Sequence, residues 1–275
     1  MAITKGMMEF SGKLGDFIFY KRNKKQVARA DSVDYKLSEN SIKSGRDFGE
    51  ASRNATYIRK AFESLVKFYG TDDFHNRLNK RLTDIFKTIP SAHFGNKKLS
   101  QGNIGLLAGF EFNKSTAFNN LFFKNIICTI EQGGLVNLSL PKSELKDIIN
   151  LIPDAEQAML EIMLFSFDLD GNEYETFKLN DLIIDLKDPL FPSRKIRRAI
   201  NHVGEKALII AIGISYLWDE SRSQHKNYFA AKISHAFHLS NGTIVKFIEP
   251  EQEKVVALVE DYSSDSDWEL VDDEE

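Results

Sequence analysis

The second half of the chain is dominated by apolar segments that are separated by Gly-containing turns. The turns at 132–134, 170–172 and 240–242 contain Gly with Gln, Asp or Asn, and each lies between two apolar or alternating runs. This pattern is typical of antiparallel β-hairpins. The run ALIIAIGISYLW at 207–218 is almost wholly apolar, which indicates a strand covered on both faces. Repeated hairpins of this kind favour an antiparallel β-sandwich or barrel, and we predict a sandwich over residues 99–248.

The connections between these hairpins carry a different pattern. SELKDIINLI at 143–152 and PSRKIRRAINHV at 192–203 space their apolar residues in a way that favours short helices. EKVVALVEDY at 253–262 alternates enough to form one more strand. We therefore expect two short connecting helices and an additional strand near the end.

Two longer helices are predicted before the sandwich. Apolar residues recur every three or four positions over 41–69 and again over 73–89, which places each set on one helical stripe. Gly70 and Pro90 are suitable helix stops, and the short link at 70–72 favours an antiparallel helical hairpin. The two stripes consist of Phe48, Ala51, Ala55, Ile58, Phe62, Leu65 and Tyr69, and of Phe74, Leu78, Leu82, Ile85 and Ile89.

The first thirty residues have the pattern of a β-hairpin. Phe17, Phe19 and Val27 are expected to form its apolar face, with a tip at 22–25. Gly12 and Gly15 precede it and suit positive φ or a bulge. An isolated hairpin is marginally stable in water. This one must therefore pack on its own domain or on a neighbouring subunit.

Charge divides the chain into three regions. Residues 1–100 have a net charge of +9, residues 101–248 of −2 and residues 249–275 of −11. The acidic end is rich in Ser and poor in apolar residues, a composition that does not fold alone. We predict an α+β protein in three parts: a basic β-hairpin with a helical hairpin (1–98), an antiparallel β-sandwich (99–248) and a flexible acidic tail (249–275).

Several motifs resemble those of an uncharacterised family of Bacteroidota proteins. Lys5-Gly6 is followed by GKLGDFIFYKRNKKQVAR, which contains the pattern G-x-x-G-D-x-x-F-Y, and then by Phe-Gly-x-Ala at 48–51. LLAGFEFN at 106–113 and IAIGISYLWDE at 210–220 continue the resemblance in the same order. The resemblance implies an N-terminal hairpin and helices followed by a β-sandwich, and it implies no activity. The acidic end departs from the family pattern.

No catalytic or cofactor-binding constellation is evident. Cys128 is the single cysteine and lies in an apolar run. We therefore expect its thiol to be buried and unreactive. His235 and His238 are three apart and would point to opposite faces of a strand. Asp168 to Glu175 offers oxygen ligands for Ca²⁺, but an Asp-Gly turn is the simpler interpretation. We expect a protein that is not an enzyme, with no cofactor and no metal.

We therefore interpret the chain as a structural or interaction protein. It would assemble with copies of itself or with other protein subunits, for example in a phage-related assembly, by adding a strand of its N-terminal hairpin to a neighbour's sheet. Its oppositely charged ends would attract each other across subunits. The residues expected to make these contacts are Phe17, Phe19, Tyr20, Trp268 and Leu270.

Nucleic-acid binding is the alternative function. A basic front would contact phosphates in a salt-sensitive way, with the acidic tail as an internal competitor. The start lacks an apolar run of signal-peptide length, and no segment has the ~20 apolar residues that cross a bilayer. We expect no membrane partner and a location in the cytoplasm or a virion. The residues assigned to nucleic acid are Lys21, Arg22, Lys24, Lys25, Arg59 and Lys60.

Overall fold

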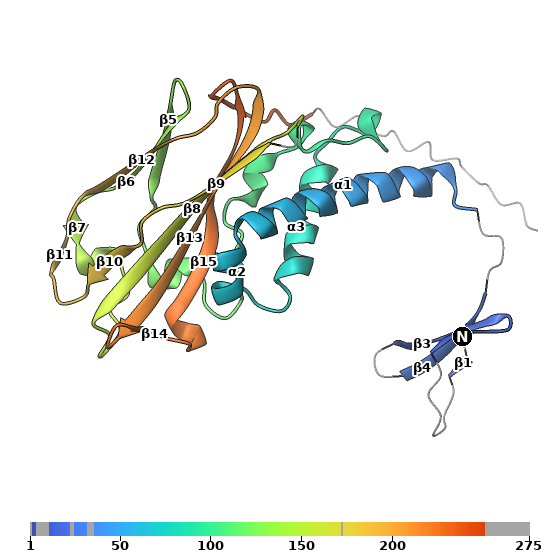
Figure 1. The fold of residues 1–275 in the computed structure, drawn as a ribbon, viewed down its shortest axis with the longest axis horizontal. Helices are drawn as coiled ribbons and strands as arrows, with labels where there is room; N and C mark the ends of the chain where they lie inside the picture. The colour runs from blue at the N-terminus through green and yellow to red at the C-terminus, as the bar shows by residue number, and fades with distance from the viewer. Residues whose placement is uncertain (1, 4–10, 23–24, 32–35, 172, 251–275) are drawn as a thin grey trace, which may run out of the picture.

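A computed structural model describes residues 2–3, 11–22, 25–31, 36–171 and 173–250. The first of these form a small antiparallel sheet, and Figure 1 shows it at the N-terminal end of the chain. Its strands follow the order β1-β4-β3-β2. The expected hairpin is therefore present, and two further short strands extend it. The four strands are β1 (Ala2–Ile3), β2 (Gly12–Leu14), β3 (Phe17–Arg22) and β4 (Lys25–Ala30).

The two predicted helices are present, but the first is divided. α1 (Glu39–Ala61) and α2 (Glu63–Tyr69) are separated at Phe62, whose φ of −101° and ψ of 25° depart from helical values. α3 (Phe74–Lys87) follows and packs against α1, which it crosses steeply (Figure 1). Every residue of the two expected stripes is buried except Phe48, which is 58% exposed. That part of the prediction is wrong because the N-terminal half of α1 extends past the sheet (Figure 1).

Short elements connect the helices to the sheets. The segment 109–112, within the LLAGFEFN motif, runs along a long strand, β15 (Phe229–Ser240). The Gly109 and Phe112 amides donate to Ile233 and Ala231 of that strand at 2.8 and 2.7 Å. This motif thus covers part of a sheet edge. The other connecting elements are η1 (Ser91–His93), η2 (Leu99–Gln101), η3 (Ile104–Leu107), α4 (Phe118–Leu121) and η5 (Lys226–Tyr228).

A seven-stranded antiparallel sheet is the centre of the fold. Its strand order is β10-β8-β13-β15-β16, with β9 paired to β8 and β14 to β13. The central strand, β13, is buried along nearly its whole length on both faces, as its apolar sequence predicts. The strands other than β15 are β8 (Gln157–Asp168), β9 (Tyr174–Lys178), β10 (Leu182–Asp185), β13 (Glu205–Trp218), β14 (Ser221–Arg222) and β16 (Thr243–Val245).

A three-stranded sheet in the order β12-β6-β5 packs on one face of the large sheet. Its strands are β5 (Ile127–Glu131), β6 (Leu135–Leu140) and β12 (Arg194–Ala199). β12 corrects the helix expected over 192–203, because this segment pairs with β6 from Arg194↔Leu140 to Ala199↔Leu135. The helix expected over 143–152 is also wrong. That segment holds β7 (Ser143–Glu144), which pairs with β11 (Leu190–Phe191), and one 3₁₀ turn, η4 (Leu145–Asp147).

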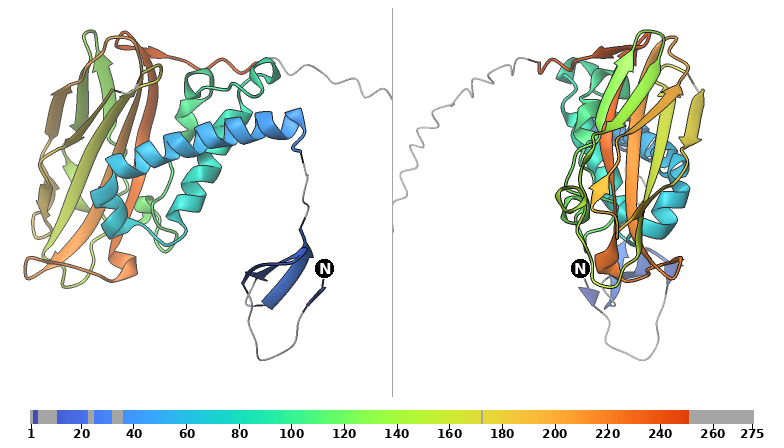
Figure 2. Two further views of the ribbon diagram at one scale, coloured as in Figure 1. Left: turned by 45° about the vertical axis from the view of Figure 1, so that its right-hand side comes forward. Right: turned by 90° about the vertical axis from the view of Figure 1, so that its left-hand side faces the viewer.

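The chain from α1 to β16 therefore forms three layers, which Figure 1 and the left view of Figure 2 show: the three-stranded sheet, the large sheet and the helices. Alternate residues of β13 supply two cores. Ala207, Ile209 and Ala211 face the helices, whereas Leu208, Ile210 and Ile212 face the three-stranded sheet. The α+β sandwich prediction is confirmed. The boundary expected at residue 98 falls inside the helix-side core, which continues from α1 into β8, β13 and β15.

Candidate interaction surface

Three of the residues expected to bind a partner, Phe17, Phe19 and Tyr20, lie on β3 of the N-terminal sheet. In its register Phe17 pairs with Ala30, Phe19 with Ala28 and Tyr20 with Val27. Because side chains alternate along a strand, Phe17 and Phe19 share one face and Tyr20 lies on the other. Val27 shares the Tyr20 face, so placing it with the two phenylalanines is wrong.

The sheet has almost no interior of its own. Among its residues of described burial only Val27 and Ala28 are buried. Leu14 is 66% exposed and Phe17 is 53% exposed, and both belong to the face that carries Phe19. Neither hydrophobic core includes a residue of this sheet. Much of the apolar surface of this sheet is therefore open to solvent in the single chain.

The turn that joins β2 to β3 has the backbone geometry that its glycines permit. Gly15 has φ of +56° and Gly12 has φ of +119°, values that other residues rarely adopt. The expectation of positive φ at these glycines is confirmed. Lys13 forms an ion pair with Asp31, and the Asp31 amide donates to the Asp16 carbonyl at 2.7 Å. These contacts hold the two ends of the β2–β4 unit together.

The basic residues of the alternative hypothesis lie on two separate elements. Lys21, Arg22 and Lys25 are exposed at the end of the β3–β4 hairpin, where Arg22 and Lys25 pair directly. Arg59 and Lys60 belong to α1, and the Arg59 guanidinium lies 3.2 Å from His75 Nδ1. No described contact joins the two sets. Lys24, Trp268 and Leu270, together with the strand expected at 253–262, lie outside the described residues.

A buried charged network, which local sequence patterns do not predict, joins the helices to the large sheet. Glu161 Oε2 accepts hydrogen bonds from Tyr69 Oη at 2.7 Å and from Arg222 Nη2 at 2.5 Å. Lys178 Nζ lies 3.2 Å from Glu161 Oε1. Burial raises the pKa of Glu161, but Tyr69 and Arg222 outweigh this effect, so the pKa falls below its usual value. The network keeps a charged carboxylate inside the protein.

The network depends on one glycine. Gly213 pairs with Glu161 across the sheet, and the Tyr69 ring lies directly over it. The ring can reach Glu161 only because residue 213 has no side chain. Two features of the sequence could have indicated the network: a Glu within QAMLEIMLFSF and a Gly within ALIIAIGISYLW. The network attaches α2 to the large sheet, which indicates a structural role.

The other residues that could react or bind a metal ion lie apart from one another. Burial raises the pKa of the Cys128 thiol to about 11, which leaves little reactive thiolate at neutral pH. Within the described residues no three His, Cys, Asp or Glu side chains are grouped to hold a metal ion. His235 pairs with Ile210 and His238 with Ala207, which face opposite cores. None of the helices described here is long and apolar enough to cross a bilayer.

Comparison with known proteins leaves the geometry as the basis for assigning function. No protein-family model and no curated protein matches this chain.

Proposed function

We propose that this chain is a non-catalytic assembly protein whose N-terminal sheet adds to the sheet of another subunit, either a second copy or another component of a larger, phage-related structure. One observation carries the proposal: the N-terminal sheet exposes Leu14 and Phe17, and none of its residues of described burial belongs to either core. A partner that covers this sheet would supply the interior that it lacks.

The apolar surface is large enough to matter energetically. Phe17 is 53% exposed, and a Phe side chain buries roughly 200 Å² in full. About 100 Å² thus remains to be covered, which corresponds to about 2.5 kcal/mol at 25 cal/mol per Å². Leu14 adds to the same face. Covering this face would contribute substantially to a protein interface.

Backbone geometry suits the same role. β2 pairs with β3 on one side, and its other side is an edge of the described sheet. An edge strand presents N–H and C=O groups to a further strand. Opposite charge supports association as well, since residues 1–100 have a net charge of +9 and residues 249–275 of −11.

A matched pair of substitutions tests the proposal. Phe17→Asp should weaken association about 50-fold or more, since about 2.5 kcal/mol of burial is lost. Phe48→Asp is the control, because Phe48 is similarly exposed, at 58%, but lies on α1. Light scattering over a range of concentrations measures both. Equal effects of the two substitutions, or no effect of Phe17→Asp, would contradict the proposal.

Nucleic-acid binding through the hairpin tip is the second candidate. Arg22 and Lys25 are adjacent and exposed, and neither forms an ion pair with a described residue. Phosphate contacts by these side chains would weaken steeply with salt. Arg22→Glu should then reduce the affinity for a DNA or RNA duplex at low salt. Unchanged or negligible binding by the wild-type chain and this variant would exclude the tip as a nucleic-acid site.

A further inference from the structure

A polar pocket of about 350 Å³ lies beside the turn of the β8–β9 hairpin, at one end of the large sheet. Its size is within the range of small-molecule pockets. The side chains next to it on the same face of the sheet, Leu164, Leu208 and Ile210, belong to the apolar core between the large and three-stranded sheets. The pocket itself is lined by polar residues and one tyrosine: Ser166, Glu173, Tyr174, Glu175, Asn201 and Lys206.

The sheet register directs the polar side chains to one face. Ser166 pairs with Glu175 on β9 and with Leu208 on β13. Lys206 pairs with Asp168, two residues along the same strands. Directly paired residues, and residues two apart on a strand, point to the same side of a sheet. All four polar side chains therefore share the Leu208 side, which faces the three-stranded sheet.

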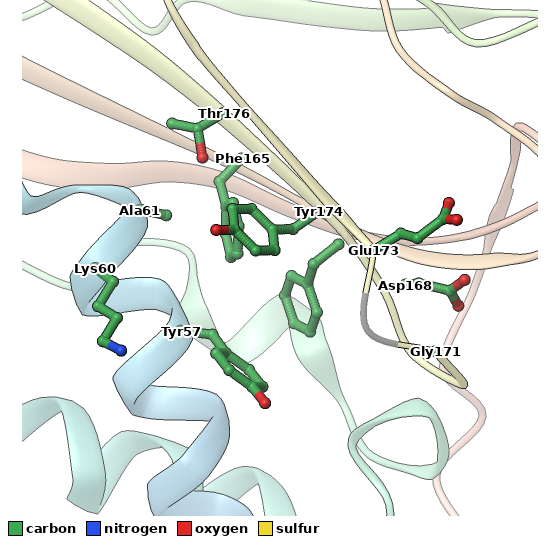
Figure 3. A pocket seen from close by; sticks show the side chains of 10 residues that line it. Tyr57, Lys60, Ala61, Phe165, Asp168, Gly171, Glu173, Tyr174 and Thr176 are labelled. Carbon is green, nitrogen blue, oxygen red and sulfur yellow. The ribbon is translucent and has the colours of Figure 1, made fainter.

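The β8–β9 hairpin separates this pocket from the aromatic side chains that face α1. In Figure 3 the carboxylates of Asp168 and Glu173 point away from the ring of Phe165. The segment that follows β12 borders the pocket, and there the Asn201 amide donates to Glu175 Oε2 at 2.9 Å. This hydrogen bond holds one carboxylate in place at the pocket wall.

Two buried polar groups in the pocket lack hydrogen-bond partners. Ser166 is 2% exposed, and its Oγ has no hydrogen-bond partner in the part of the chain that the structure describes. Lys206 is 4% exposed, and its Nζ lies 3.7 Å from Asp168 Oδ2. This distance permits an ion pair but is too long for a hydrogen bond. Because buried polar groups are nearly always hydrogen-bonded, both groups indicate a ligand that accepts from them.

The surrounding charges favour a neutral acceptor. Asp168 already compensates the Lys206 ammonium, and Glu173 and Glu175 add two carboxylates to the pocket. These carboxylates would repel a phosphate or a carboxylate group of a ligand. A hydroxyl group accepts from an ammonium or another hydroxyl, and it donates its own proton to a carboxylate. Neighbouring hydroxyls on one small molecule thus match both the buried donors and the carboxylates.

We propose that this pocket binds a neutral sugar, either a free monosaccharide or the terminal residue of a glycan. One hydroxyl accepts from Lys206 and Ser166, and its neighbour donates to Glu175. The two sources of the sugar share this chemistry. The site goes beyond the proposed function, because none of the residues that line it lies on the N-terminal sheet.

Saturation-transfer NMR of the full-length chain with neutral monosaccharides tests this inference, and a glycan array extends the test to terminal residues. The probes are glucose, galactose, mannose, fucose, N-acetylglucosamine and N-acetylgalactosamine. We expect at least one to bind, in either format, and to bind more tightly than glucuronate and galacturonate, which carry a carboxylate. Binding on the array alone would assign the sugar to the end of a glycan. Absence of binding in both formats, or a preference for the acidic sugars, would overturn the inference.

Ser166→Ala tests whether the sugar binds in this pocket. Loss of one hydrogen bond to the ligand should weaken binding about tenfold. Thermal unfolding should occur at the wild-type temperature, because Ser166 Oγ bonds to no described residue. Ser139→Ala is the matched control, since Ser139 lies on β6, outside the pocket. Glu175→Gln keeps an acceptor for the Asn201 amide but removes the charge, and it should weaken binding about fivefold. Equal affinities of Ser166→Ala and Ser139→Ala would overturn the inference.

Discussion

Replacing Gly213 with Ala tests the buried network that attaches α2 to the large sheet. A Cβ at this position would lie 2.6 Å from Cε2 and 2.7 Å from Cζ of Tyr69. The ring has little room to retreat, because Tyr69 is fully buried and packs against Phe68 and Phe229. The substitution must therefore displace the ring or the strand.

The expected cost has two parts. Overpacking of a core costs about 1–3 kcal/mol. Loss of the hydrogen bond from Tyr69 to the charged Glu161 adds about 1.5–3 kcal/mol. We expect Gly213→Ala to lower the free energy of unfolding by roughly 3–5 kcal/mol, a large part of the stability of a typical domain.

Urea unfolding followed by circular dichroism measures this change, with Gly45→Ala as the matched control. Gly45 lies within α1 with open space around the position of a Cβ, so the same substitution should stabilise the protein by about 0.5–1 kcal/mol. In a Tyr69→Leu background, Gly213→Ala should cost less than about 1 kcal/mol because the clash is absent. A loss below about 1 kcal/mol in the wild-type background would refute the packing argument.

Three further outcomes follow from buried groups. Glu161→Gln should destabilise the protein by about 2–3 kcal/mol in urea unfolding at pH 7, since it leaves Arg222 without its charged partner. Because the pKa of Glu161 is lowered, the charged carboxylate stabilises the fold above the ordinary carboxyl pKa, and this stabilisation is lost as the pH falls through the folded-state pKa. A destabilisation by Glu161→Gln that is as large at low pH as at pH 7 would contradict this. Burial and Lys232 lower the pKa of His235, so stability should fall as the pH decreases below about 6.5, and thermal unfolding of His235→Gln should show a weaker pH dependence. Burial raises the pKa of Cys128 to about 11, so a thiol reagent at pH 8 should label the folded protein far more slowly than the urea-unfolded protein; equal rates would show an accessible thiol.

Local patterns predicted most of the elements. β13 is apolar on both faces, and no arrangement other than burial between two layers satisfies that sequence. The stripes of α1 to α3 are nearly all buried because a helix presents every third or fourth residue to the sheet. In these cases the period of the sequence and the surface it packs against agree.

The errors arise where long-range pairing decides the structure. β12 contains Arg, Lys and Ala, which favour helices, yet pairing with β6 makes it a strand. Phe48 fits the stripe of α1 but lies beyond the surface that covers it. Local sequence does not encode either fact.

The buried network could not be predicted from local sequence for the same reason. Tyr69 and Glu161 are 92 positions apart, and Glu161 and Arg222 are 61 apart. Only the register of β8 with β13 brings them together. The β-hairpin that carries Phe17, Phe19 and Tyr20 could be predicted because its residues are close together in the sequence. The face of Val27 could not, because it depends on the register, which pairs Val27 with Tyr20.

The solution mass of the wild-type chain beside a chain that lacks residues 1–31 tests the assembly claim most directly. Neither core includes a residue of the N-terminal sheet, so the shortened chain should unfold at the same temperature as the wild type. We predict that the wild-type mass rises above the monomer value of 31.4 kDa with concentration, and that the shortened chain stays monomeric. A wild-type mass of one chain at every concentration, or the same oligomer in both proteins, would contradict the account.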